Sequence, residues 1–218
     1  MATATAYGKI YVDFDTGTNT FFGANVADLL GKIASKPVGS ALLTALGSRT
    51  APNNPTYNVL IKPQVQAGLN AMYTDARFTR SQLSNPGPTD ILRATSEPWG
   101  GLKMGGGVGS GAQPDDWSGA QGGGGSSSTV IWNSTQSVFQ AKILIPHFIL
   151  LAHELIHCLH NLLGTNKGEK KVTVGSETIK HEEVFCVGLG DYAGDAITEN
   201  AIRAEWPGVP NRDTYGSG

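Results

Sequence analysis

The chain has 218 residues, with 16 basic and 18 acidic side chains and a formal net charge of −2. This length suits a single domain over residues 1–218, and the balanced charge, without a basic tract, gives no reason to expect a nucleic-acid partner. No apolar run reaches the roughly 18–20 residues of a membrane span, and the N-terminus lacks the features of a secretory signal. We therefore expect no membrane segment and no signal peptide.

The N-terminal part predicts strands alternating with helices. Residues 9–14 alternate like a strand. Residues 25–46 carry apolar side chains at helical spacing, interrupted at residues 37–39, and predict one or two amphipathic helices. A second strand is expected over residues 57–61, stopped by Pro63.

Residues 100–128 are rich in glycine and serine and are predicted to form a flexible loop inserted within the domain. The stretch contains no glycine motif of the kind that binds phosphate. The strand that follows, Thr129–Trp132, precedes the most apolar segment of the chain. We expect this strand to be a sheet edge that pairs with extended substrate, with the glycine loop as its gate.

The most informative motif is His-Glu-x-x-His, formed by His153, Glu154 and His157. Residues at i and i+4 are neighbours on a helix face, so the two imidazoles can share one metal ion. Glu154 points away from this pair and would hold the attacking water and take its proton. The motif therefore predicts one zinc ion and a metallopeptidase.

The surroundings of the motif predict a long buried helix. Pro146 suits its first turn and Gly164 the position just after its last turn. The alternative is a core helix with satisfied histidines. Three unpaired polar groups in such a helix would each cost about 1–3 kcal/mol, which favours the metal.

His160 is a poor candidate for the third zinc ligand. On a straight helix its Cα lies about 10.5 Å from that of His153, so three side chains do not converge easily on one ion. In the metzincin pattern a third histidine stands at the position held here by Leu163, so this arrangement is not expected.

A second group of potential ligands lies in an apolar segment at residues 180–191. Glu182 and Glu183 diverge by about 100° on a helix, so only one of them can bind the metal that His153 and His157 hold. Helical periodicity does not choose between them, and His181 is a minor candidate. The alternative is a solvated charge pair at a helix start.

The chain has two cysteines, Cys158 and Cys186, and hence no disulfide framework. Both follow predicted ligands closely in the sequence. Two reduced core cysteines are favoured over one disulfide.

Two segments resemble active-site elements of clostridial neurotoxin light chains. Residues 153–164 match His-Glu-Leu-Ile-His-x-x-His-x-Leu-x-Gly, the zinc helix. Residues 182–191 match their second segment, Glu-Glu-x-x-x-x-Gly-x-x-Asp, in which the second glutamate binds zinc. This resemblance implies that Glu183 is the third ligand.

Two further segments near the C-terminus, residues 198–200 and 211–215, also resemble elements of those active sites. The resemblance implies that Glu199 is an acid behind the ligands and that Arg212 and Tyr215 face the scissile carbonyl. A cation and a phenol there would stabilise the oxyanion of peptide hydrolysis. Glu199 could equally be an acid on a helix face or hold Arg212 in place.

In size and layout the chain is similar to the NleD-like effector metallopeptidases, most specifically over residues 143–215. This resemblance implies an α+β, single-domain zincin with a small mixed sheet. It also implies limited endoproteolysis of an intracellular protein, with a host signalling kinase as a candidate substrate. A monomeric effector delivered by a specialised secretion system into the target-cell cytoplasm is expected.

Two other functions are open. One is the same chemistry in a toxin domain of a polymorphic protein aimed at rival bacteria. The other is a zinc-stabilised binding module without hydrolysis. Glu154, Arg212 and Tyr215 argue against the binding module, because a protein that only binds needs none of them.

Overall fold

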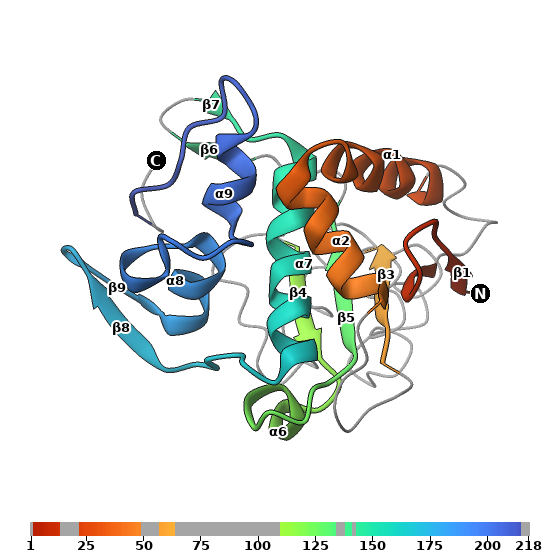
Figure 1. Ribbon diagram of the computed structural model, residues 1–218, viewed down its shortest axis with the longest axis horizontal. Coiled ribbons are helices and arrows are strands. Elements are labelled where there is room, and N and C mark those ends of the chain that lie inside the picture. Colours follow the sequence, from red (N-terminus) through yellow and green to blue (C-terminus); the bar gives the residue numbers. More distant parts are fainter. Residues whose placement is uncertain are drawn as a thin grey trace, which may run out of the picture.

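The most apolar segment of the chain forms α7 (His147–Leu163), a helix at the centre of the computed structural model (Figure 1). Pro146 precedes it, and Gly164 ends it in the left-handed conformation with φ of 69°. Both ends agree with the sequence prediction. At the C-terminal end, glycine adopts the left-handed conformation without steric cost. The structure describes residues 2–13, 22–48, 57–63, 110–133, 138–140 and 143–214.

A mixed sheet packs against α7. In spatial order its strands are β1 (Ala2–Ala4), β2 (Ile10–Asp13), β3 (Val59–Pro63), β5 (Ser128–Trp132) and β4 (Gly111–Pro114). The three inner strands are parallel, and the outer strands β1 and β4 run antiparallel to their neighbours. Side chains from β2, β3 and β5 join those of α7 in one core. The predicted α+β class with a small mixed sheet is confirmed.

Two helices, α1 (Phe22–Ala34) and α2 (Pro37–Ser48), pack on one side of α7. Pro37 is the first residue of α2, where its missing N–H has no partner to lose. The two helices meet at a tight corner. A Cβ on Gly39 would lie 2.1 Å from the carbonyl oxygen of Ile33, so only glycine fits there.

The prediction of a flexible loop over residues 100–128 is wrong for its second half. Residues 111–128 include β4 and the short helix α6 (Trp117–Gln121), and residues 100–109 lie outside the described part of the chain. The backbone N–H of Gly123 donates to the carbonyl of Gly164 at 3.0 Å. A Cβ on Gly164 would stand 2.4 Å from the Cα of Gly123. Glycines here permit close backbone packing against the end of α7.

The prediction that Thr129–Trp132 forms a sheet edge is also wrong. The strand β5, which contains these residues, lies between β3 and β4 and pairs with both. The edge beside α7 is β4, whose residues were expected in the glycine-rich loop.

The C-terminal part covers the other side of α7 (Figure 1). A hairpin of β8 (Lys171–Val174) and β9 (Glu177–Lys180) leads into α8 (His181–Val187), and α9 (Glu199–Ala204) follows a short 3₁₀ turn. Near α9, β6 (Phe139–Gln140) pairs with β7 (Ile143–Leu144). The carboxylate of Glu205, which caps α9, accepts the N–H of Val38 at the start of α2 at 3.0 Å.

The helices α8 and α9 are in direct contact where one ends and the other begins. Gly188 ends α8 with φ of 80°, and Thr198 caps the N-terminus of α9. A Cβ on Gly188 would lie 2.7 Å from both the Cβ and the Oγ1 of Thr198. The backbone at Gly188 therefore packs directly against the Thr198 side chain, which leaves no room for a larger residue at position 188.

Cys158 and Cys186 are both buried and free, as the sequence predicted. Burial raises the pKa of the Cys158 thiol to about 12. Among the described residues, no helix combines the length and the apolar character that crossing a membrane requires.

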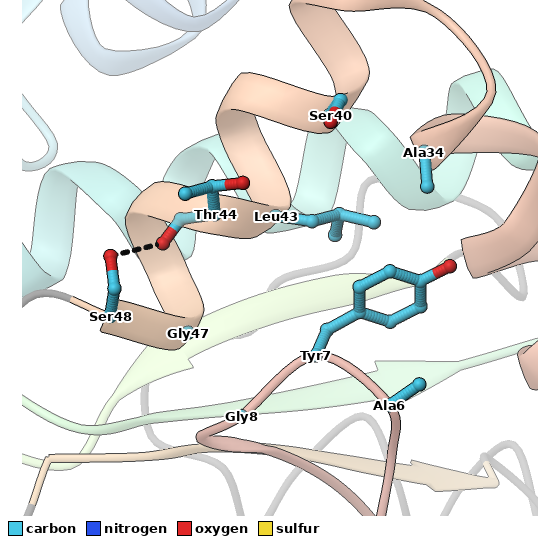
Figure 2. Close-up of a pocket in the computed structure, with 9 residues that line it drawn as sticks. All are labelled: Ala6, Tyr7, Gly8, Ala34, Ser40, Leu43, Thr44, Gly47 and Ser48. Atoms are coloured by element: carbon cyan, nitrogen blue, oxygen red, sulfur yellow. Dashed lines mark hydrogen bonds between the residues drawn. The ribbon is translucent and has the colours of Figure 1, made fainter.

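A surface pocket of about 250 Å³ lies between the N-terminal turn and α2 (Figure 2). None of the residues that line it carries a charge, and none belongs to the motifs singled out in the sequence. They are Ala6, Tyr7, Gly8, Ala34, Ser40, Leu43, Thr44, Gly47 and Ser48.

Close packing at the end of α7 gives a testable prediction. Gly164 and Gly175 both have positive φ, but a Cβ would meet backbone atoms within 4 Å only at Gly164, because Gly175 faces open space. We expect Gly175→Ala to lose roughly 1–2 kcal/mol of unfolding free energy from backbone strain alone. Gly164→Ala should lose clearly more in urea denaturation. Equal losses would show that the glycine-rich segment does not pack against α7 as described.

Candidate metal centre

The three side chains that the sequence predicted as zinc ligands meet on one side of α7. The Nε2 atoms of His153 and His157 lie 3.1 Å apart, as expected for residues at i and i+4. The Oε2 atom of Glu183, on α8, lies 3.2 Å from the first nitrogen and 3.5 Å from the second. The three atoms form a nearly regular triangle.

A carboxylate holds the other nitrogen of each imidazole. His153 Nδ1 lies 2.7 Å from Glu199 Oε2, and His157 Nδ1 lies 2.9 Å from Glu182 Oε1. An ionised carboxylate only accepts hydrogen bonds, so each Nδ1 carries the proton. In the neutral imidazoles both Nε2 atoms then present lone pairs, and these point at one another and at Glu183.

This arrangement fits a bound cation. Three lone pairs within about 3.5 Å repel one another unless a positive charge lies between them. The Glu183 oxygen in the triangle is buried and has no hydrogen-bond donor among the described residues. Ligands at 2.0–2.1 Å from a tetrahedral zinc ion are separated by about 3.3 Å, which is close to the separations found here.

The pKa values point the same way. Burial alone would lower the pKa of His153, but Cys186, Glu183 and Glu199 together raise it well above its usual value. His157 behaves similarly, and its pKa is also raised. The surroundings of the two imidazoles therefore favour positive charge at this point of the structure.

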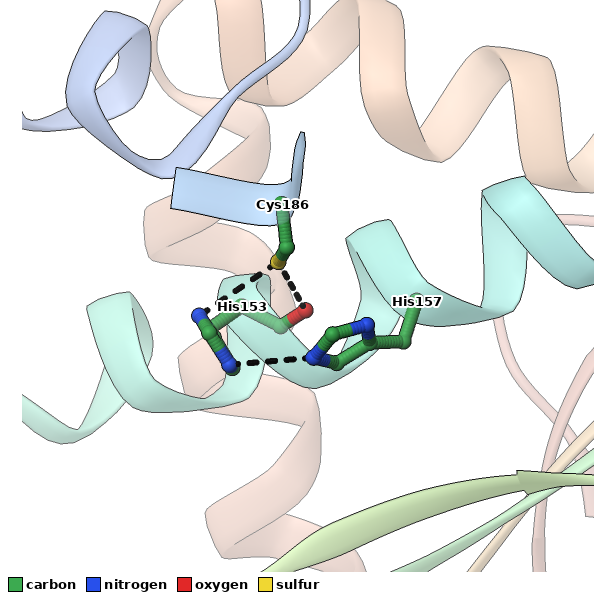
Figure 3. Close-up of side chains that lie close together, drawn as sticks. All are labelled: His153, His157 and Cys186. Carbon is green, nitrogen blue, oxygen red and sulfur yellow. Dashed lines mark hydrogen bonds between the residues drawn. The ribbon is translucent and has the colours of Figure 1, made fainter. Parts of the chain in front are cut away.

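Cys186 is close to this centre but on a different side of His153 (Figure 3). Its Sγ lies 3.4 Å from His153 Nδ1 and 3.4 Å from the carbonyl oxygen of the same residue. That nitrogen already donates to Glu199, whereas the nitrogen in the triangle is Nε2. Cys186 therefore packs behind His153 and does not complete the triangle.

The carboxyl group of Glu154, on α7, faces the edge strand β4. Burial raises the pKa of its carboxyl group, and the neighbouring His153 and His157, together with a hydrogen bond from the backbone of Ala112, offset part of this effect. A carboxyl group with a raised pKa can accept a proton and return it at neutral pH more easily than a solvated one.

Glu199 connects the centre to two arginines. Its Oε1 accepts a hydrogen bond from Arg203 Nε at 2.6 Å and lies 3.3 Å from Arg212 Nε. Although burial alone would raise the pKa of Glu199, His153 and the two arginines lower it to about 2. Glu199 is therefore an anion in the core that orients His153 on one side and two cations on the other.

Arg212 is held by its backbone as well as its side chain. Its N–H donates to Asn200 Oδ1 at 2.7 Å, and its carbonyl accepts from Asn200 Nδ2 at 2.8 Å. Tyr215, the other predicted oxyanion donor, lies outside the described residues. The minor candidate His181 is engaged elsewhere, since its Nε2 lies 2.7 Å from the hydroxyl oxygen of Tyr192.

Arg203 was not expected from the sequence. This side chain is fully buried and also donates from Nη1 to Gln140 Oε1 at 2.8 Å and to the carbonyl of Pro210 at 2.7 Å. An arginine four residues after a glutamate usually indicates an exposed helix pair. The spacing of Glu199 and Arg203 therefore gave no signal that this pair is buried in the core.

Comparison with protein families gives a match over residues 14–215 to the Peptidase_M91 model, described as "Effector protein". This match covers most of the chain. The chain therefore belongs to this family of NleD-like effectors, as the sequence motifs predicted. Among curated proteins no match is found.

Two solved structures resemble the fold at low identity. The Clostridium botulinum neurotoxin serotype F light chain shares 16% identity with a TM-score of 0.49, covering 88% of this chain and 49% of that one. The botulinum neurotoxin serotype HA light chain shares 14% identity with a TM-score of 0.47, covering 91% of this chain and 56% of that one. The present chain thus spans about half the length of these structures.

The Glu199–Arg203 pair gives a second prediction. Removing one partner of a buried ion pair leaves a buried charge uncompensated and typically costs about 3–5 kcal/mol. We expect a loss of this size in Arg203→Met, measured by urea denaturation. Asp28 and Lys32 form a pair at the same i,i+4 spacing with both side chains more than half exposed. Lys32→Met is therefore the control, and its loss should stay below about 1 kcal/mol. Equal losses in the two variants would contradict the buried network.

Proposed function

We propose that this protein is a zinc-dependent endopeptidase of the glutamate-zincin type, with residues 1–218 as one peptidase domain. His153, His157 and Glu183 would hold one zinc ion. The observation that carries this proposal is the triangle of two Nε2 atoms and one carboxylate oxygen, spaced 3.1–3.5 Å apart. The carboxylates on the outer nitrogens support it, because metal-binding histidines almost always donate their other N–H in this way.

A zinc ion at this site would lower the pKa of a bound water and polarise the scissile carbonyl. Glu154 lies one residue after the first ligand and takes the proton of the attacking water. It then returns this proton to the leaving amine as the peptide bond breaks. The raised pKa of Glu154 supports both steps, since the group must exchange a proton near neutral pH.

Arg212 is proposed to stabilise the oxyanion that develops on the scissile carbonyl, together with Tyr215. Its side chain is 15% exposed and remains tied to Glu199, so it is held in place and still reachable from solvent. A preorganised donor of this kind is typically worth about 10²–10³ in rate. Glu199 acts behind the ligands by orienting His153 and Arg212.

The substrate is proposed to bind as an extended segment along β4. This strand is the sheet edge nearest α7 and lies beside Glu154. Pro114 ends the strand, and proline lacks the N–H needed to continue a ladder. Pairing would therefore be short, which suits limited cleavage of one accessible segment better than digestion of long unfolded chains.

Membership in an effector family supports action inside another cell. We propose limited cleavage of a specific intracellular protein, a host signalling kinase being one candidate, after delivery by a specialised secretion system. Action as a monomer is part of the same proposal.

The catalytic proposal is tested with Glu154→Gln. Peptide termini are mapped in eukaryotic cell lysate treated with the wild-type protein, with this variant, or with Glu169→Gln. Glu169 is an exposed carboxylate away from the centre, with 68% of its side chain accessible. We expect new termini in one or a few proteins with the wild type and the control, and a rate about 10²–10⁴-fold lower with Glu154→Gln. Full cleavage by Glu154→Gln would contradict the role of Glu154 as the base. A Glu154→Gln protein that cuts nothing but keeps the full biological effect would instead support a binding module.

The ligand assignment is tested by zinc titration against a competing chelator. Glu183→Ala removes an atom of the triangle, whereas Glu182→Ala removes a group that would influence the metal through its hydrogen bond to His157. We expect about a 10–100-fold loss of affinity for Glu182→Ala and a larger loss for Glu183→Ala. Glu169→Ala should bind zinc like the wild type. Equal losses for Glu182→Ala and Glu183→Ala would contradict the assignment of Glu183.

A further inference from the structure

The third histidine of α7, His160, has no role in the proposed mechanism, yet its side chain is buried, with 3% exposed. Its Nδ1 lies 2.7 Å from Glu182 Oε1. The same oxygen lies 2.9 Å from His157 Nδ1. One carboxylate oxygen therefore connects His160 to an imidazole of the metal centre.

This group of three does not form a second metal site. Both nitrogens lie at hydrogen-bond distance from one carboxylate oxygen, and an oxygen that only accepts requires a proton on each nitrogen. Neither Nδ1 atom therefore has a lone pair available for a metal. Instead, one carboxylate oxygen accepts hydrogen bonds from two N–H donors.

The remaining oxygen of Glu182 is also occupied. The backbone N–H of Lys167, in the turn after α7, donates to Glu182 Oε2 at 2.8 Å. With three donors on two oxygens, the carboxylate has little freedom to rotate.

His160 is itself fixed by the helix that carries Glu182. Its ring stacks on Phe185 of α8 with centroids 3.8 Å apart and planes inclined by 5°. Phe185 stands three residues after Glu182, so α8 holds the imidazole at its edge through the carboxylate and at its face through the phenyl ring. Rotation of His160 away from Glu182 would break both contacts.

We propose that His160 is a positioning residue of the metal centre. By donating its Nδ1–H to Glu182, it keeps the carboxylate aligned with His157. His157 then carries its proton on Nδ1 and directs the Nε2 lone pair into the triangle. This inference rests on the proposed zinc site. It adds His160 to the residues that support the site, because two hydrogen bonds through Glu182 connect His160 to the ligand His157.

Two substitutions distinguish the effect of the His160 N–H donor from the effect of its aromatic ring. His160→Phe keeps an aromatic ring for stacking on Phe185 but loses the donor. His160→Asn loses the ring but places an amide N–H near the position of Nδ1. The control is His147→Phe, the same substitution on the same helix at a histidine whose ring makes a T-shaped contact with Trp132.

Zinc affinity is measured for each variant by chelator competition, after circular dichroism has shown that it folds. We expect His160→Phe to bind zinc about tenfold more weakly, at the lower end of the range for groups that orient ligands. His160→Asn should recover most of this loss, and His147→Phe should match the wild type. Wild-type affinity in His160→Phe, or equal weakening in the Phe and Asn variants, would overturn the inference.

A spectrum of the wild-type protein tests the same point without any variant of His160. Long-range ¹H–¹⁵N correlations of the zinc-loaded protein should show the proton on Nδ1 of both His157 and His160. A His160 protonated only on Nε2 would overturn the inference. The zinc site is checked separately with His157→Ala. If the wild type binds no zinc, or His157→Ala binds as well as the wild type, the proposed function itself fails.

Discussion

The structure depends on how the polar side chains of one buried helix, α7, are matched by carboxylates from its neighbours. Two imidazoles on α7 face each other with their lone pairs, and a third lone pair from Glu183 meets them. Such an arrangement is repulsive by itself, and burial makes the repulsion stronger. Carboxylates on the outer nitrogens fix the tautomers that create it, and the same carboxylates favour a cation at its centre. The elements around α7 can be understood as the means of holding these groups in place.

Each layer of the fold contributes one part of that matching. The sheet and the helices α1 and α2 bury the apolar faces of α7, which fixes the direction in which its histidines point. The opposite side belongs to α8 and α9, which supply the acids. Arg203 then balances Glu199, and its hydrogen bonds to Gln140 and Pro210 connect the centre to peripheral segments. A chain of hydrogen bonds thus leads from His153 through Glu199 and Arg203 to these segments.

The sequence predicted what is local and left open what is tertiary. Spacing within α7 was enough to place His153, Glu154 and His157 together, because a helix fixes neighbours at i and i+4. It did not choose between Glu182 and Glu183, since that choice depends on how α8 is rotated against α7; only the family resemblance named Glu183. The glycine-rich composition of residues 100–128 was read as flexibility, whereas Gly123 serves close packing against Gly164. The edge strand was misplaced for the same reason, because β4 was hidden in that stretch.

The contact between Gly188 and Thr198 has a consequence for how this site can evolve. Glu182 and Glu199 orient different imidazoles, but they belong to helices that touch through a glycine with no room for a Cβ. The positions of the two helices are therefore coupled. A side chain at position 188 would push α8 and α9 apart and so disturb the orientation of both imidazoles, although residue 188 contacts neither of them. We therefore expect evolution to retain glycine at position 188 while this arrangement of histidines and carboxylates is kept.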